Sequence, residues 1–458
     1  MLLTSLHKGD VPTMKKLLLI CMFVLAALPV LTQSAFAAGD GPSKDMLKGI
    51  VTEVNAAERT VVFEKDGTKE IRVLALGEKM NIEDMKMNTK VLINLDKHAG
   101  ENVMKDFSVM FMDMTVTKLL ALLAIGAIGG LLSGFIGSGG AFVMTPAMMS
   151  LGVPGAVAVA SNMCHKFPKA MVGAYKRWKY GQADIKLGLV MSTTAIIGVQ
   201  IGIKIQKFIL GQFGGAGSNL YISAVFMVVL VFVGGYVFYD AWKMAKGTGE
   251  ETVSKLAIAM QKINLPPMIH FKTANITISA WITIPIGVLT GMLAATIAVG
   301  GFVGVPGMIY VLGASAVVAS ATELIIAFVM GAWGSVQWGL SGLIDIRLSL
   351  LLLATSLIGV QLGALGTTYV KDYIIKVVMA TTMLIVAVSR GVMVPGYLAD
   401  VGFIAPIDAG TITVLGRISY WSLLLALGSA GLIIVVAMVK GMTADRRSKK
   451  SLAGVSHG

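Results

Sequence analysis

Residues 130–146 read Gly-Leu-Leu-Ser-Gly-Phe-Ile-Gly-Ser-Gly-Gly-Ala-Phe-Val-Met-Thr-Pro, and their main features recur 161 residues later in the chain. Gly130 matches Gly291, and the glycine pair at 139–140 matches the pair at 300–301. The same offset relates two four-residue runs downstream, Asp184-Ile-Lys-Leu to Asp345-Ile-Arg-Leu and Ile197-Gly-Val-Gln to Ile358-Gly-Val-Gln. Only the proline departs from it, because Pro146 and Pro306 lie 160 residues apart. Two such runs at one fixed offset predict a single unit written twice.

The composition is that of a polytopic membrane protein. Of the 458 residues, 55% are hydrophobic and only 14% are charged, whereas soluble domains have about a quarter of their residues charged. Apolar runs of about 20 residues are long enough to cross the hydrocarbon core as helices. We expect such segments near residues 117–136, 155–175, 183–209, 219–243, 277–298, 315–336, 346–368, 373–389 and 419–440. The net charge of +13 does not indicate nucleic acid, since the basic residues fall in loops between these segments.

The N-terminus has the pattern of a secretory signal. Lys15 and Lys16 precede an apolar run at 17–30, and Ala35-Phe-Ala37 is a small-x-small cleavage site. An uncleaved anchor helix is the alternative, and in both cases the following residues begin outside the cytoplasm. Residues 38–110 then alternate apolar and polar residues around an Asp66-Gly67 turn, which predicts a small antiparallel sheet or barrel of four or five strands. A passive cap or a partner-docking module is the favoured role for this part.

Loop charges decide the topology. If every apolar segment crossed fully, the basic residues at 175–186 would face outward, against the positive-inside rule. If residues 137–152 instead form a broken, re-entrant segment, that loop, the 244–274 loop and the C-terminal tail all face the cytoplasm. The two units then run in opposite directions, as in the inverted repeats of secondary transporters.

The predicted fold is therefore an all-α polytopic membrane protein, an inverted repeat with broken helices, preceded by a small extracytoplasmic β domain. We expect a signal peptide at 1–37, the β domain at 38–110, repeat 1 at 116–245 and a cytoplasmic loop at 246–274. Repeat 2 follows at 275–390, then an outer loop with the last helix at 391–440 and a cytoplasmic tail at 441–458.

The two breaks are the candidate substrate site. Residues 137–140 and 299–301 interrupt helices where glycine permits unusual backbone angles. Irregular backbone in a bilayer is tolerated only where it is buried in protein or lines a cavity. The next half-helix then presents its N-terminal N–H groups, which attract an anion. The alternative is that these glycines merely allow close helix crossing.

Polar residues downstream of the breaks extend this candidate site. Ser161-Asn162 and Thr322-Glu323 occupy equivalent positions, and Glu323 lies in an apolar run, where a charge costs about 2.5–3.5 kcal/mol on insertion scales. Burial raises a carboxyl pKa, which suits proton coupling, although an inter-helix hydrogen bond is an equal alternative. Lys166 lies one turn after Asn162. The alternative for the lysines is snorkelling to the cytoplasmic interface, which we favour for Lys169.

Other polar side chains have weaker signals. His165 is a possible proton carrier, and Gln200 and Gln361 either donate to substrate or bridge helices. Asp184 and Asp345 begin helices, where N-capping is the simpler role. The predicted substrate-binding residues are Gly137, Ser138, Gly139, Gly140, Ser161, Asn162, Lys166, Gln200, Gly300, Gly301, Thr322 and Gln361.

These motifs resemble the sulfite exporter TauE/SafE family, also called the toluene-sulfonate uptake permease family. The resemblance covers roughly 117–440 and rests on residues 130–146 and 152–162 and their second copies, 291–306 and 313–323. It implies a secondary transporter of small sulfur-containing anions, such as sulfite or organosulfonates, coupled to protons. Asn162 and Glu323 depart from the small hydroxyl residue expected at their positions.

We accordingly predict a bacterial inner-membrane carrier with an extracytoplasmic N-terminal domain and a cytoplasmic C-terminus. Its expected partners are a small anionic substrate, protons and membrane lipid, with no nucleic acid, no cofactor and no metal, and with Glu323 as the proton-coupling residue. A membrane-anchored sensor or scaffold acting through the outer domain is the alternative. An enzyme is not expected, since no HExxH motif, paired Asp or Ser/His arrangement is present.

Overall fold

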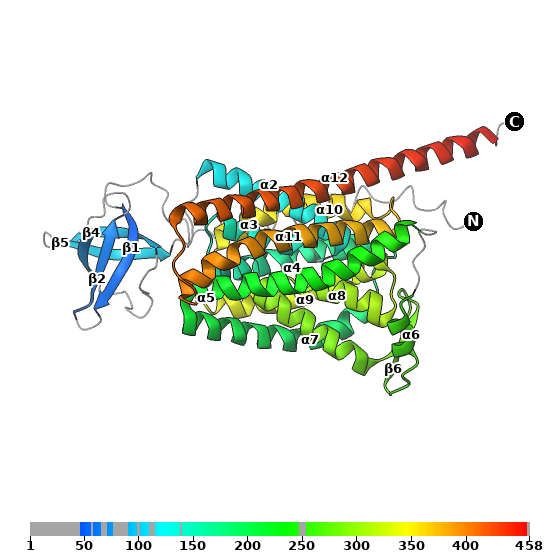
Figure 1. The fold of residues 1–458 in the computed structure, drawn as a ribbon, viewed down its shortest axis with the longest axis horizontal. Coiled ribbons are helices and arrows are strands. Elements are labelled where there is room, and N and C mark those ends of the chain that lie inside the picture. Colours follow the sequence, from blue (N-terminus) through cyan, green and yellow to red (C-terminus); the bar gives the residue numbers. More distant parts are fainter. Residues whose placement is uncertain are drawn as a thin grey trace. The chain divides into compact units, whose positions relative to one another are not determined.

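The computed structural model describes residues 46–55, 58–65, 71–76, 90–98, 101–109, 115–137, 140–246 and 253–455. Its chain divides into two compact units between Met110 and Phe111 (Figure 1). The predicted signal peptide, residues 1–37, lies outside the described residues, so it stays a prediction.

The first unit is a closed barrel. Its described strands are β1 (Met46–Asn55), β2 (Thr60–Lys65), β3 (Ile71–Leu76), β4 (Lys90–His98) and β5 (Glu101–Val109), in the order β1-β2-β3-β5-β4. Val51, Val61 and Phe63 are fully buried in it. The predicted small barrel is confirmed, with one correction: β3 and β5 pair parallel, whereas the other neighbours are antiparallel. The predicted Asp66-Gly67 turn lies outside the described residues.

The second unit is a bundle of long helices that lie side by side along one axis (Figure 1). Repeat 1 comprises α2 (Val116–Ile136), α3 (Ala141–Ser150), α4 (Gly155–Lys179) and α5 (Ile185–Lys246). A short α6 (Lys255–Gln261) and a hairpin of β6 (Met268–Phe271) and β7 (Ile276–Ser279) connect the repeats. Repeat 2 comprises α7 (Ala280–Ile297), α8 (Gly301–Gly307), the π-helical turn η3 (Met308–Leu312), α9 (Ala316–Gly339), α10 (Ile346–Gly366) and α11 (Asp372–Val401), and α12 (Ala409–Val455) ends the chain.

Within the described residues, seven helices are long and apolar enough to cross a membrane, and the 25-residue α4, which contains several polar and charged side chains, is not one of them. The 62 residues of α5 are long enough for two crossings. Gly214 breaks this helix with a φ of 62°. Gln206 Nε2 donates to Ser218 Oγ over 2.6 Å, although residues 12 apart in a straight helix lie about 18 Å apart. The chain therefore reverses near Gly214, as the two predicted segments required.

The two copies run in opposite directions. The equivalent helices α4 and α9 pack together, with Gly173 near the end of α4 against Leu324 near the start of α9. At the other end of the pair, Gly334 of α9 lies against Met163 of α4. Equivalent helices that pack antiparallel are related by a twofold axis across them, so the predicted inverted repeat is confirmed.

Glycine sets the closest helix contacts of each copy. A Cβ on Gly130 of α2 would collide with the backbone of Ser356 in α10, and one on Gly291 of α7 would collide with the backbone of Ala195 in α5. These two contacts are equivalent by the 161-residue offset. Small residues permit such approach between membrane helices, which explains why these glycines recur at matched positions.

Both copies have a broken helix, as predicted. Repeat 1 breaks at Gly137, with a φ of 104°, and repeat 2 at Ala298, with a φ of 61°. The following half-helices begin at the N-caps Gly140 and Gly300, which lie 160 residues apart, so the second break is one residue shorter. The π-helical turn η3 contains one more residue than an α-helical turn would. It restores the offset to 161 at the Gly152 and Gly313 turns, which accounts for the displaced proline.

Acidic residues begin several helices. Asp184 Oδ1 accepts from Leu187 N over 3.0 Å, and Asp345 Oδ1 accepts from Arg347 N over 3.0 Å, which confirms both predicted N-caps. Asp408 caps α12 in the same way and accepts from Thr411 N over 2.8 Å. This hydrogen bond lowers the pKa of the exposed Asp408 carboxyl. The last helix therefore begins ten residues before the predicted apolar segment at 419.

Candidate functional site

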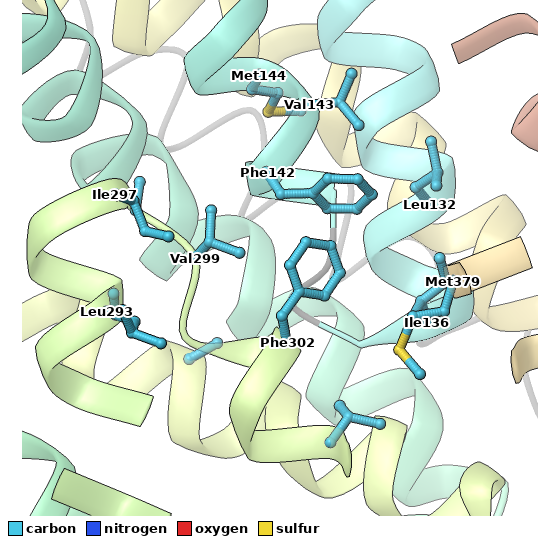
Figure 2. Packing of buried hydrophobic residues seen from close by; sticks show 14 of the residues in the cluster. Leu132, Ile136, Phe142, Val143, Met144, Leu293, Ile297, Val299, Phe302 and Met379 are labelled. Carbon is cyan, nitrogen blue, oxygen red and sulfur yellow. The ribbon is translucent and has the colours of Figure 1, made fainter. Parts of the chain in front are cut away.

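The two half-helices meet at their N-terminal ends. Phe142, the second residue of α3, and Phe302, the second residue of α8, have ring centroids 4.1 Å apart at an angle of 59°. Both rings are fully buried. Figure 2 shows the two rings pointing toward each other, with Leu132, Ile136 and Val299 nearby. The breaks therefore converge, and apolar side chains close the point where they meet.

A polar stripe faces this region from α4. Asn162, Lys166, Lys169 and Arg177 are spaced at i, i+4, i+7 and i+15, which places them on one face of the helix. All four side chains are fully buried. We call this set the α4 polar stripe. Asn162 joins it to α3, because its Nδ2 donates to Ala141 O over 2.6 Å and to Thr145 Oγ1 over 2.7 Å.

The two lysines of the stripe have unsatisfied ammonium groups. The Nζ atoms of Lys166 and Lys169 are buried and have no hydrogen-bond partner. Lys166 interacts electrostatically with Glu323 and with Lys169. The prediction that Lys169 extends to the cytoplasmic interface is wrong, because its side chain is fully buried in the protein. A buried ammonium without partners is unfavourable, so this arrangement favours an anion between the helices.

His165 and Arg177 complete the basic character of α4. His165 Nδ1 contacts Asn162 O at 2.8 Å, and its Nε2 is buried without a hydrogen-bond partner. Arg177 donates to Gly134 O at 3.0 Å, to Phe135 O at 3.3 Å, to Val317 O at 2.8 Å and to Ser320 Oγ at 2.9 Å. Arg177 thus joins the end of α2 to the start of α9. This role could not be predicted from the sequence, because Arg177 lies in a run of basic residues that is typical of a loop.

Glu323 lies on α9 at the position equivalent to Asn162. It is fully buried, and its Oε2 leaves no room for a side chain at Gly304 of α8. Thus Glu323 faces the second half-helix as Asn162 faces the first. The remaining stripe positions on α9 hold Ala327, Met330 and Trp338, so the charge there is confined to one carboxylate.

The other predicted residues fall into two groups. Ser161 Oγ accepts from Asp345 N over 2.9 Å, and Thr322 Oγ1 accepts from Asp184 N over 3.0 Å, so both hydroxyls bind the helix starts of the opposite copy. Gln361 donates to Leu357 O of its own helix over 3.1 Å, and Gln200 is partly exposed. The structure does not bring these glutamines into the buried group around α4.

The predicted glycines lie at the breaks themselves. A Cβ at Gly137 would collide with Ser320 O, and one at Gly140 would collide with Gly129 O. Gly300 and Gly301 begin the second half-helix. Ser138 and Gly139 lie outside the described residues, so their part in the site stays a prediction.

Comparisons with known proteins agree with this architecture. The family model described as "Sulfite exporter TauE/SafE" matches residues 122–390, which is more than half of the chain. A curated relative from Bacillus subtilis (strain 168), "Probable membrane transporter protein YdhB", is 22% identical over 253 residues, covering 54% of this chain and 89% of the relative. No solved structure matches the chain. The chain is therefore a multi-pass membrane protein that belongs to the sulfite exporter TauE/SafE family of membrane transporters.

Proposed function

We propose that the membrane unit is a secondary transporter of small sulfur-containing oxyanions, such as sulfite or organosulfonates, and that it works by alternating access. One observation carries this proposal: two buried ammonium groups without hydrogen-bond partners, on Lys166 and Lys169, lie one and two turns from Asn162. Asn162 is bonded to the first turn of α3, where the half-helices meet. An oxyanion supplies both the negative charge and the hydrogen-bond acceptors that these groups lack.

The two half-helices supply the second part of the proposed site. The N–H groups at the start of a helix have no partner within the helix and carry partial positive charge. α3 and α8 direct these ends toward the Phe142–Phe302 contact from opposite sides. An anion held between them would contact the backbone at Gly137, Gly140, Gly300 and Gly301. The basic side chains of the α4 polar stripe would supply the positive charge.

Alternating access follows from the opposite orientation of the copies. In an inverted repeat, each copy can adopt the conformation of the other, which turns an inward-facing state into an outward-facing one. The Phe142–Phe302 pair is shared by both copies, so it is the proposed barrier between the two half-channels. Moving one half-helix away from the other would expose the lysines to one side only.

Glu323 is the proposed proton carrier. It is the acidic member of the buried group and interacts electrostatically with Lys166. Protonation of Glu323 would leave the lysines uncompensated and would therefore favour anion binding. Proton and anion would then move in the same direction, since each favours the binding of the other.

Basic residues support the proposed orientation in a bacterial inner membrane. Lys176, Lys179, Lys243 and Lys246 lie at the ends of α4 and α5. Asp240 near the end of α5 pairs with Lys376 near the start of α11 over 2.8 Å. The end of α5 and the start of α11 therefore lie on the same side of the bundle. The positive-inside rule assigns that side to the cytoplasm. The barrel then lies outside and the C-terminus inside.

The test is uptake into proteoliposomes that contain the purified full chain. Sulfite, sulfate, thiosulfate and sulfonates are compared with and without an imposed pH gradient. We expect saturable flux of at least one sulfur oxyanion, strongly reduced in Lys166→Met and retained in Lys207→Met, whose lysine is exposed on α5. The absence of flux for every anion would refute the transporter proposal, and equal flux in both variants would remove Lys166 from the site.

A further inference from the structure

Another buried cation, Arg390, lies away from the α4 polar stripe, where three helices of the bundle meet. Arg390 of α11 is 1% exposed. Its Nη2 donates to Ser150 Oγ over 2.8 Å, to Ser419 Oγ over 2.5 Å and to Ser389 Oγ over 3.3 Å. Ser150 is the last residue of α3, and Ser419 belongs to α12. Three hydroxyl groups from three helices therefore surround one edge of this guanidinium group.

The rest of the guanidinium group is unsatisfied. Nε and Nη1 of Arg390 are buried and have no hydrogen-bond partner. Within the described part of the chain, no carboxylate is paired with Arg390, and Tyr397 is the titratable group that acts on it electrostatically. A phenol is neutral at physiological pH. Three N–H donors and one positive charge thus remain uncompensated in the protein interior.

Unlike Lys166 and Lys169, two other buried cations of this bundle, Arg177 and Lys376, have partners, although Nε of Arg177 has none. Arg177 has both Nη atoms bonded to carbonyl and hydroxyl oxygens, and Lys376 is paired with Asp240 over 2.8 Å. Removing a guanidinium group from water without a counter-charge is strongly unfavourable. Arg390 therefore requires an anion that is not supplied by the side chains around it.

Arg390 has no basic counterpart in the first copy of the repeat. The equivalent residue of the first copy is Val229, and Ser419 belongs to a helix that has no counterpart in either copy. Its contact with Ser150 is also far from the breaks. α3 has ten residues, so its last residue lies about 13.5 Å along the helix from its first residue. A ligand at Arg390 would be separate from one at the α4 polar stripe.

We propose that Arg390, with Ser150, Ser389 and Ser419, forms a second binding site for an oxyanion group between α3, α11 and α12. Guanidinium and hydroxyl groups together match the tetrahedral oxygens of a sulfate, sulfonate or phosphate group. The same chemistry is offered by a free anion in solution and by the phosphate of a lipid headgroup. The site holds one such group and fixes the outer end of α3 to α12.

The test measures sulfate binding to the purified full chain in nanodiscs of phosphatidylcholine alone. Isothermal titration compares wild type with Arg390→Met and with Lys166→Met. We expect Arg390→Met to remove one sulfate site, or to weaken it at least about tenfold, because it removes charge-assisted hydrogen bonds. Lys166→Met should leave that site unchanged. Because the assay needs no transport, failure of the transporter proposal would not affect it.

A second arm separates the two sources of the oxyanion. Nanodiscs that contain phosphatidylglycerol are analysed for lipid retained by the protein after delipidation. Retention in wild type that is lost in Arg390→Met assigns the site to a headgroup, whereas sulfate binding without lipid retention assigns it to a free anion. Identical sulfate isotherms and identical lipid retention in wild type and Arg390→Met would overturn the proposal.

Two further variants guard against a simple loss of folding. Arg390→Lys keeps the charge without the planar guanidinium group, and Ser419→Ala removes one hydroxyl group. We expect both to bind sulfate more weakly than wild type and more tightly than Arg390→Met. If Arg390 only joins the three helices, Arg390→Met lowers the melting temperature while the folded fraction binds sulfate as wild type does, and this result also overturns the proposal.

Discussion

The equivalent helices α4 and α9 share their framework and differ in their chemistry. They pack antiparallel across the twofold axis of the repeat, and each binds the helix start of the opposite copy through a hydroxyl group, Ser161 or Thr322. Along the same face, however, α4 carries two lysines and an arginine, whereas α9 carries Ala327, Met330 and Trp338. The hydrogen bonds that hold the helix starts are therefore present in both copies, whereas the basic side chains are present only in the first.

This difference shows which interactions the two copies must share. Helix packing and capping act within a pseudo-symmetric scaffold, so a change in one copy would distort its fit with the other. A substrate at the proposed site would contact both copies at once, so one copy could supply the positive charge and the other the carboxylate. The Lys166–Glu323 interaction joins these two contributions.

The largest expected effect comes from removing the charges of α4. Lys166→Met and Lys169→Met should each lower kcat/KM for the transported anion by about 10- to 100-fold, since hydrogen bonds to charged groups contribute about 1.5–3 kcal/mol. Met330→Leu, at the position of α9 equivalent to Lys169, should change it little. Uptake into proteoliposomes provides the measurement. If Met330→Leu lowered kcat/KM as much as Lys169→Met, the two copies would not differ in function.

Glu323→Gln tests the contribution of the second copy. We expect transport to continue at a lower rate and to lose its response to an imposed pH gradient, because the amide cannot exchange a proton. Asp408→Asn, which changes an exposed carboxylate at the start of α12, is the matched control and should keep the response. The comparison uses initial rates with and without the gradient, and a retained response in Glu323→Gln would remove Glu323 as the proton carrier.

The symmetric glycine contacts should respond alike in both copies. Gly130→Ala and Gly291→Ala each place a Cβ against the backbone of a neighbouring helix, and overpacking costs about 1–3 kcal/mol. Gly235→Ala is the control, because nothing lies within 4 Å of a Cβ at that position. Thermal unfolding in detergent reports the difference. A large effect in only one copy would contradict the equivalence of the two interfaces.

The smallest effects are expected at the hydroxyl groups that hold helix starts. Ser161→Ala and Thr322→Ala should each destabilise the protein by about 1 kcal/mol, since each leaves a buried N–H without its acceptor. The KM for the anion separates this role from substrate binding. If KM is unchanged in both variants, the hydroxyl groups serve the fold, whereas a rise in KM would support the assignment made from the sequence.

The fold could be predicted in detail, because its signals are local or periodic. Apolar length located the helices, the 161-residue offset located the copies, and loop charge indicated their opposite orientation. Apolar length and loop charge follow from the bilayer itself. The parallel β3–β5 pairing could not be predicted, since alternation reports which face a residue occupies and not which strand lies beside it.

The candidate site was only partly predictable. Lys166 and Glu323 were predicted because a charge in an apolar run is conspicuous, yet the same reasoning placed the buried Lys169 at the interface. Whether a lysine reaches water depends on what covers it, and the neighbouring helices that enclose Lys169 are distant in the sequence. The serines around Arg390 were missed for the same reason, because their convergence is a tertiary property.

The π-helical turn at Met308–Leu312 has a consequence for any comparison of the two copies. One residue is missing at the second break and one extra residue is wound into this turn, so the two changes act like a pair of compensating frameshifts. Between them, the copies must be aligned one position out of step. Phe142 then corresponds to Phe302 and Ser150 to Tyr310. An ungapped alignment would assign each of these residues the wrong partner in the very segment where the two copies meet.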